Sequence, residues 1–360
     1  MFNKRWFQVL VFLILVFLLI WLVSAVNFIF DPLLKYVGAV AVPVIGAGIL
    51  YYITKPLMLF FERFKINRTF SIILVFFVLV LIGLVVVMYI APIAQKQFSN
   101  LVDNIPKMVA WAQELIAYWQ TNQITLPEQV NDAIDHFTDN LQSYIEGVAN
   151  YLFGFIGQLI SFITSLVLIP FFLFFMLKDG EKLVPFVTQI LEKKKADNLK
   201  ILLKKIDETL TAYIQGQVLV SFCVGVLLLI GYLIIGLKYS LTLALFAMIM
   251  NVIPFLGPFI AVVPALVVGA FQDPMMVVWV ALVTLVAQQI ESNFISPNVM
   301  GRVLSLHPLT VITIILAGGS IAGFLGILFA VPFYAVIKTI VIHFYQTYRQ
   351  SKEHEDDALI

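Results

Sequence analysis

Strongly apolar blocks alternate with short clusters of charge along the whole chain. About eight blocks can be delimited, and most approach the roughly 20 apolar residues that a helix needs to cross a bilayer. Their length indicates helices in lipid rather than one large soluble core. The pattern therefore predicts an all-α polytopic membrane protein. The blocks are residues 7–30, 36–53, 69–91, 147–177, 209–237, 239–272, 274–290 and 303–337.

Two of these blocks are too irregular for a single straight span. As one helix, residues 239–272 would measure about 51 Å, against a hydrocarbon core of about 30 Å. Clustered prolines and glycines do not sustain a helix, so each block is predicted to form two half-length helices around a turn. The residues at the two breaks are Asn251, Pro254, Gly257 and Pro258 in the first block and Gly318, Gly319, Gly323 and Gly326 in the second.

Irregular backbone at membrane depth survives only where it is buried in protein or lines a watery cavity. Paired interrupted segments are also the best sequence pointer to a transporter's binding site. The eight residues at the breaks are therefore candidates for a solute or ion pathway. The alternative is a pair of long, kinked spans, because membrane helices tolerate Pro and Gly.

Composition and charge support the membrane interpretation. The 360 residues are 61% hydrophobic and 12% charged, whereas a soluble domain carries about 25% charged residues. The net charge of +1 gives no field that favours nucleic acid. The single cysteine, Cys223, excludes an internal disulfide and cysteine-rich metal sites. No metal or other cofactor is expected.

The basic residues set the predicted orientation. They cluster around residues 4–5, 55–68, 178–205 and 338–352, and alternating spans place all four clusters on one side. By the positive-inside preference this side is the cytoplasm, and it holds both termini.

The sequence predicts six segments. They are a transmembrane scaffold (1–91), an external amphipathic helical insertion (92–146), a transmembrane helix (147–177), a cytoplasmic basic amphipathic segment suited to anionic lipid (178–208), a transport core (209–345) and a disordered cytoplasmic tail (346–360). The external insertion would lie at the headgroups or pack on itself or on a neighbouring subunit.

A cluster of polar side chains lies between the broken blocks: Gln288, Gln289, Glu291 and Asn293. Ionisable residues at membrane depth are costly and commonly functional. Glu291 is the only carboxylate here that could lie at depth, and it is the candidate for coupling transport to H+ or Na+. The alternative is an interfacial acid that is hydrated or paired with Arg302.

Several chemistries have no sequence basis. The chain has no GxxxxGK[ST] phosphate loop, no HExxH and no GxSxG. An enzyme is therefore not expected, and a potassium-channel TVGYG filter is missing as well.

The sequence resembles the autoinducer-2 exporter family of bacterial permeases. The resemblance rests on five stretches and covers essentially the whole chain: PFFLFFMLKDG (170–180), TAYIQGQ (211–217), NVIPFLGPFIAVVPA (251–265), ESNFISPNVMGRVLSLHPL (291–309) and GGSIAGFLGILFAVP (318–332). It implies export of a small polar signalling molecule from the bacterial inner membrane and assembly into a homo-oligomer. Some relatives are sodium(lithium)/proton antiporters.

Residues and resemblance together favour a secondary transporter or facilitator for a small polar solute. Two alternatives stay open: a sodium(lithium)/proton antiporter, and a non-transporting membrane scaffold that uses the external helices for interaction. Broken segments beside a polar cluster are costly features that a scaffold does not need.

Overall fold

The computed structural model describes residues 5–25, 27–121, 168–300 and 307–357. Throughout these ranges the regular secondary structure is helical. The helices are α1 (Arg5–Ala25), α2 (Asn27–Arg63), α3 (Arg68–Val85), the π-helix η1 (Val86–Ile90), α4 (Ala91–Thr121), α6 (Leu168–Thr188), α7 (Lys193–Ile234), α8 (Ser240–Met250), α9 (Leu256–Gln272), α10 (Pro274–Ile290), the π-helix η3 (Glu291–Ile295), α11 (Ser296–Met300) and α12 (Pro308–Asp357).

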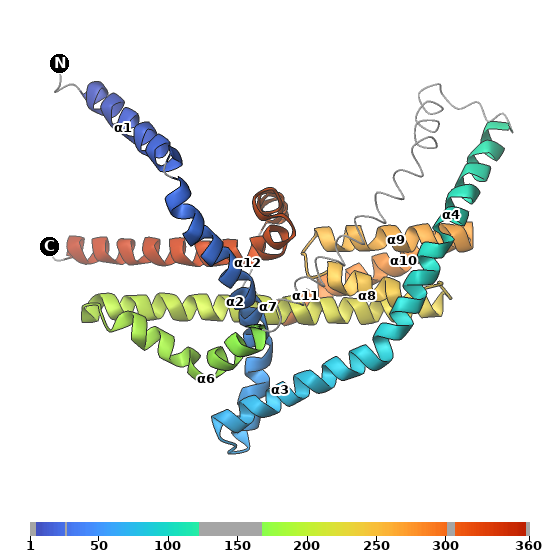
Figure 1. Ribbon diagram of the computed structural model, residues 1–360, viewed down its shortest axis with the longest axis horizontal. Coiled ribbons are helices and arrows are strands. Elements are labelled where there is room, and N and C mark those ends of the chain that lie inside the picture. The colour runs from blue at the N-terminus through green and yellow to red at the C-terminus, as the bar shows by residue number, and fades with distance from the viewer. Residues whose placement is uncertain (1–4, 26, 122–167, 301–306, 358–360) are drawn as a thin grey trace.

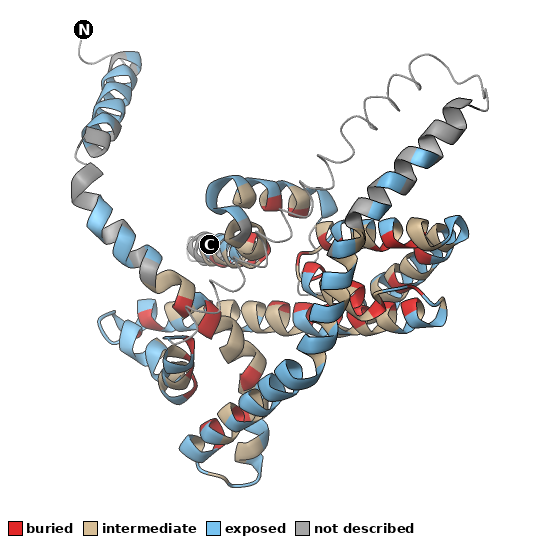
Figure 2. Ribbon diagram, turned by 45° about the vertical axis from the view of Figure 1, so that its right-hand side comes forward, coloured by how far each residue is buried: buried red, intermediate tan, exposed pale blue. Residues whose placement is uncertain are grey.

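Five helical stretches in the described ranges are long and apolar enough to cross a membrane. Shorter apolar helices accompany them, including α8, α9 and the first part of α12. Buried positions concentrate where α7 meets α8, α9 and α10, while the outward faces remain exposed (Figure 2). Many of those exposed side chains are large and apolar, such as Phe77 and Val80 of α3, as expected of surface that faces lipid. The predicted all-α polytopic membrane fold is confirmed.

The first interrupted block folds into a hairpin of two short helices, α8 and α9. At its open end the side chain of Gln272 accepts a hydrogen bond from the Lys238 amide (2.9 Å) and donates one to the Gly236 carbonyl (2.8 Å). The hairpin therefore begins and ends at the same place, beside the C-terminus of α7 and the N-terminus of α10. Near the tip, Gly257 lies directly against the Met250 carbonyl, where a Cβ would clash. The predicted break is present as a tight turn.

The second interrupted block is a hairpin inside α12. The backbone leaves the helical region at Ala322 and at Gly323, whose φ of 58° suits glycine. The two arms then pack backbone to backbone, because a Cβ on Gly318 would lie 2.5 Å from the Gly326 carbonyl oxygen. Apolar side chains from both arms, including Ile315 and Val331, share one buried cluster.

The N-terminal scaffold is held by a separate core. Ala47 and Met58 of α2, Ile72 of α3, and Leu173 and Leu177 of α6 belong to one buried cluster. Arg68 ties these helices together at the start of α3. It donates two hydrogen bonds to the Leu177 carbonyl, from Nε (3.0 Å) and Nη2 (2.7 Å), and its Nη1 lies 2.9 Å from a carboxylate oxygen of Glu181.

Two predicted boundaries differ from the observed helices. The basic segment 178–208 and the span after it were treated as separate, but α7 runs unbroken from Lys193 to Ile234 (Figure 1). The tail 346–360 was predicted to be disordered, but α12 continues to Asp357. Both differences have one cause: residues 193–215 and 333–357 contain neither Pro nor Gly, so nothing in the chain stops a helix that has already formed.

Candidate functional site

A cavity of about 920 Å³ lies between α7, the first hairpin, α10 and the segments that follow α10. Its walls are mainly apolar, and its polar groups gather toward the end of α10. Residues from six helical segments and from the hairpin turn line it. They are Tyr213, Gln217, Pro254, Phe255, Pro258, Phe259, Val262, Ala281, Thr284, Leu285, Gln288, Glu291, Ser292, Ser296, Pro297, Met300, Val311 and Val331.

The hairpin tip forms one wall of this cavity. Helix α8 ends at Met250, the chain turns, and α9 starts at Leu256. The turn needs an uncommon backbone at Phe255, whose φ is 63°, and it turns Pro254 and Phe255 toward the cavity. At the start of the turn, the carbonyl of Asn251 accepts a hydrogen bond from Gln217 Nε2 of α7 at 2.7 Å.

The polar cluster after α10 divides between two faces. Gln288, Glu291 and Ser292 line the cavity. Gln289 and Asn293 do not, and instead bond each other on the exposed face, Asn293 Nδ2 to Gln289 Oε1 at 2.9 Å. The chain passes into the π-helix η3 at Glu291, a distortion often found at functional sites.

Glu291 supplies the only carboxylate among the residues that line the cavity. Its Oε2 is buried and has no hydrogen-bond partner among the described residues. Gln288, one turn earlier and on the same side of the helix, lies within hydrogen-bonding reach. The lining set includes no basic side chain, and Arg302, the alternative partner considered from the sequence, lies outside the described residues. The site thus offers an acceptor with spare capacity.

The glycines of the second break lie away from the cavity. Gly318, Gly319, Gly323 and Gly326 form the turn and the close approach within α12. None belongs to the cavity lining, which α12 reaches through Val311 and Val331. Gly257 likewise permits close packing of the first hairpin. Asn251 is buried behind the tip, and its Nδ2 has no hydrogen-bond partner among the described residues.

Three polar residues of the site do not stand out in the sequence pattern. Tyr213, Gln217 and Thr284 line the cavity but lie inside apolar helices, where single polar residues are unremarkable. Only the TAYIQGQ stretch, which contains Tyr213 and Gln217, could have pointed to two of them. The predicted external insertion lies outside the described residues beyond Thr121. In the described ranges no His, Cys, Asp and Glu side chains group as metal ligands.

Comparison with known proteins identifies the chain. The model of the AI-2E family transporter matches residues 7–346. This protein belongs to the AI-2E transporter family.

Three relatives illustrate the range of the AI-2E transporter family. The "Putative transport protein YueF" of Bacillus subtilis is 33% identical over 96% of each chain. The "Putative permease PerM" of Escherichia coli K12 is 28% identical over 90% of this chain and 91% of its own. The "Sodium-lithium/proton antiporter" of Halobacillus andaensis is 22% identical over 85% of this chain and 90% of its own. The protein is therefore a multi-pass membrane transporter.

Most stretches that carry the family resemblance frame the cavity. TAYIQGQ brings Tyr213 and Gln217, NVIPFLGP forms the tip of the first hairpin, and ESNFISPNVM covers η3 and α11. GGSIAGFLG forms the turn of α12. PFFLFFMLKDG instead packs in the scaffold. A Cβ added to its Gly180 would lie 3.6 Å from the Tyr51 hydroxyl oxygen.

Proposed function

We propose that the protein exports a small polar solute, with autoinducer-2 as the candidate, across the bacterial inner membrane without ATP. The observation that carries the proposal is the cavity, in which Gln288, Glu291 and Ser292 face the tip of a broken helix pair. Broken helices in transporters present peptide groups to a solute at such tips.

The chemistry of the walls suits an uncharged polar solute. The volume of about 920 Å³ lies in the range of small-molecule sites, which are mostly apolar with a few placed polar groups. Amide and hydroxyl side chains can bond a compound rich in hydroxyl groups. An anionic solute would find no basic residue in the described lining, and burying it without a partner would be costly.

The proposed orientation has both termini in the cytoplasm. Ion pairs support it, because they join segments that the sequence assigns to one side: Lys55 with Asp207 at 3.3 Å, and Arg68 with Glu181 at 2.9 Å. On the other side, the Gln97 Oε1 of α4 accepts a hydrogen bond from the Thr242 amide of the first hairpin at 3.1 Å. Assembly into a homo-oligomer stays part of the proposal and rests on the family alone.

A sodium or lithium/proton antiporter is the second candidate. The observation that favours it is the buried, unpartnered Oε2 of Glu291 in the cavity, together with the relative named as such an antiporter. In that case Glu291 would exchange a proton for the cation.

Uptake into inverted membrane vesicles, with and without a pH gradient, tests the proposal. Labelled autoinducer-2 should enter vesicles that contain the wild-type protein, and sodium addition should not collapse the pH gradient. Collapse of the gradient without autoinducer-2 uptake would favour the antiporter. If the vesicles show neither autoinducer-2 uptake nor sodium-driven collapse of the pH gradient, both candidate functions are contradicted.

Glu291→Gln separates coupling from binding. If Glu291 couples export to protons, the variant should lose accumulation against a gradient but keep exchange of solute at equilibrium. Glu208→Gln, which removes an exposed carboxylate of α7 outside the cavity, is the matched control. An unchanged pH dependence in Glu291→Gln would leave facilitated diffusion as the mechanism.

A further inference from the structure

A second cavity adjoins the first across α7. It measures about 330 Å³ and lies between α2, α7 and the second arm of α12. Tyr213 and Gln217 line both cavities. They lie one turn apart on the same face of α7 and are only 5% and 6% exposed, so together they form a partition.

The tip of the first hairpin completes this partition. Val252 faces the second cavity, while Pro254 and Phe255 face the first. Between them, Ile253 is buried in one cluster with Tyr213 and with Val331 of α12. The two hairpins and α7 therefore meet at one apolar contact that separates the cavities.

One hydrogen bond fixes the tip to α7, from Gln217 Nε2 to the Asn251 carbonyl. In the same closed arrangement, the side-chain Nδ2 of Asn251 is buried without a partner among the described residues. A buried donor without an acceptor has lost its hydrogen bond to water and gained none in return. The closed arrangement therefore carries a cost that is relieved if the tip moves and Asn251 meets water or solute.

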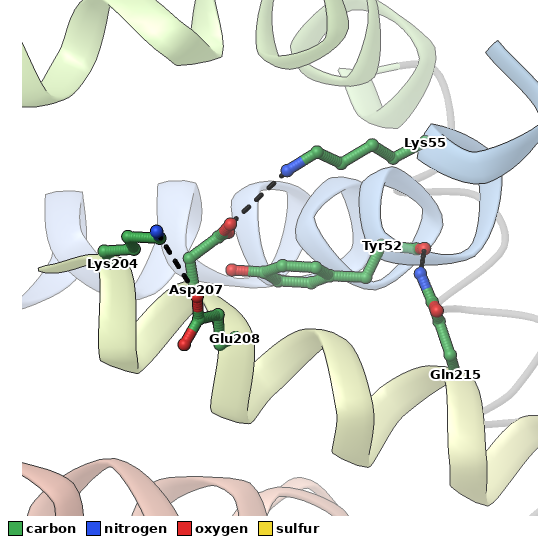
Figure 3. A network of polar contacts seen from close by, with 6 residues as sticks. All are labelled: Tyr52, Lys55, Lys204, Asp207, Glu208 and Gln215. Carbon is green, nitrogen blue, oxygen red and sulfur yellow. Dashed lines mark hydrogen bonds and ion pairs between the residues drawn. The ribbon is translucent and has the colours of Figure 1, made fainter. Parts of the chain in front are cut away.

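The opposite wall of the second cavity is tied more firmly. Gln215 Nε2 donates to the Tyr52 carbonyl at 2.7 Å, and Lys55 pairs with Asp207 at 3.3 Å. Figure 3 shows these contacts joining α2 to α7 on both sides of the Tyr52 ring. With α2 held to α7, the hairpin tip is the part of the partition that is free to move.

We propose that Tyr213, Gln217 and Ile253 form a closed gate, and that the second cavity is the compartment that solute enters when the tip leaves α7. This inference rests on the proposed transport function. It also narrows the solute class: the second cavity is lined by apolar residues apart from Tyr52, Tyr213 and Gln217. A neutral compound can pass through it, whereas a bare alkali cation would lose its ligands.

Amide hydrogen exchange tests the gate without any solute. Two glutamines of α7 offer a matched pair, because each donates its amide to a carbonyl of another element at 2.7 Å. Gln217→Leu should speed exchange several-fold in peptides that cover residues 251–257, and Gln215→Leu should leave those peptides unchanged. Equal exchange in the two variants would show that Gln217 does not hold the tip and would overturn the gate.

A reversible lock tests the path. In a Cys223→Ser background, Gln217→Cys with Asn251→Cys is bridged by a bis-methanethiosulfonate reagent, and autoinducer-2 uptake is measured before and after reduction. Bridging should abolish uptake and reduction should restore it. The control pair, Lys55→Cys with Asp207→Cys, bridges the fixed wall and should not change uptake.

Unchanged uptake after the tip has been bridged to α7 would contradict the proposed path through the second cavity. If the unmodified protein takes up no autoinducer-2, the proposed solute fails, while the exchange measurement still decides whether the gate exists.

Discussion

Among single residues, two neighbouring glutamines at the end of α10 lie in different surroundings. Gln288 lines the cavity, whereas Gln289 bonds Asn293 on the exposed face. The two side chains have the same chemistry and differ by about 100° around the helix axis. They therefore allow a direct comparison between a side chain that lines the proposed solute cavity and one that does not.

We expect Gln288→Leu to weaken solute binding and Gln289→Leu to leave it nearly unchanged. A lost hydrogen bond of about 0.5–1.5 kcal/mol corresponds to a rise in half-saturating concentration of roughly two- to tenfold. Concentration-dependent uptake into vesicles measures it. An equal rise in both variants would place the solute elsewhere.

The sequence could predict part of this residue-level picture. Glu291 and Gln288 were predicted because they belong to a polar cluster between the two broken blocks, and because ionisable residues at membrane depth are costly and commonly functional. The sequence could not distinguish Gln288 from Gln289. Helical spacing shows that the two side chains lie on different faces, but it does not show which face lines the cavity. It also could not find the contact of Gln217 with Asn251, which joins residues 34 positions apart and exists only once the hairpin has folded.

At the scale of elements, glycine decides whether the second hairpin closes. A Cβ on Gly326 would run into the backbone carbonyl of Gly318, which cannot move aside as a side chain can. Gly83 of α3 offers a control, since a Cβ there meets nothing within 4 Å.

Gly326→Ala should therefore destabilise the protein, by about 1–3 kcal/mol if the arms shift as overpacked cores do. Gly83→Ala should be neutral or stabilise by up to about 1 kcal/mol, because alanine favours a helix interior. The Tm of each variant in detergent checks both. Equal Tm values would contradict the close packing of the two arms.

The link between α3 and α6 depends more on a carbonyl than on an ion pair. A hydrogen bond from a charged donor contributes about 1.5–3 kcal/mol, and Arg68 makes two to the Leu177 carbonyl. Its pairing with Glu181, a largely exposed side chain, is worth about 0–1 kcal/mol. Arg68→Gln should accordingly lower the Tm clearly more than Glu181→Gln. A similar loss in both variants would make the ion pair the dominant contact.

The pH dependence of this pair has a defined sign. The hydrogen bond from Arg68 holds the pKa of the Glu181 carboxyl below its ordinary value, so its contribution is present above that ordinary value of about 4.3. It is lost as pH falls through the lowered pKa in the folded protein. The small Tm difference between wild type and Glu181→Gln should hold at neutral pH and disappear in acid.

The continuity of helices was predicted less well than their breaks. Clustered Pro and Gly identify where a helix must stop, which located both hairpins. A change from apolar to charged residues does not stop a helix, so α7 continues from its lysine-rich start into the apolar core and α12 extends to Asp357. The change from apolar to charged residues indicates where a helix leaves the membrane. The positions of Pro and Gly indicate where the helix itself ends.

At the scale of the whole molecule, the hairpin geometry fixes relative sides. Helix α7, the first hairpin and α10 meet at one end, where Gln272 bonds Gly236 and Lys238. If α7 and α10 each cross once and both termini are cytoplasmic, as proposed, this end would face outward and η3 would face the cytoplasm. We therefore predict that the first hairpin re-enters from outside.

Cysteine labelling tests this topology in whole cells with a Cys223→Ser background. Asp273→Cys, at the outer end of α10, should react with a membrane-impermeant thiol reagent, and Asn298→Cys should react only after the membrane is opened. Because Asn298 of α11 is exposed, its labelling after the membrane is opened shows that the cysteine itself is accessible to the reagent. Labelling of Asn298→Cys from outside would place α11 on the external side. That result would contradict the predicted sides of the membrane and the entry of the first hairpin from outside.

Solute is proposed to pass through the cavity beside Glu291, and a bulky side chain that fills this cavity should block transport. Ala281 lines the cavity, while the next residue, Leu282, is exposed and lies outside its lining. Tryptophan is introduced at each position, and autoinducer-2 uptake into inverted vesicles is measured at equal amounts of folded protein. Ala281→Trp should abolish uptake, because its side chain would fill the cavity, and Leu282→Trp should retain it. Wild-type uptake by Ala281→Trp would show that solute does not pass through this cavity.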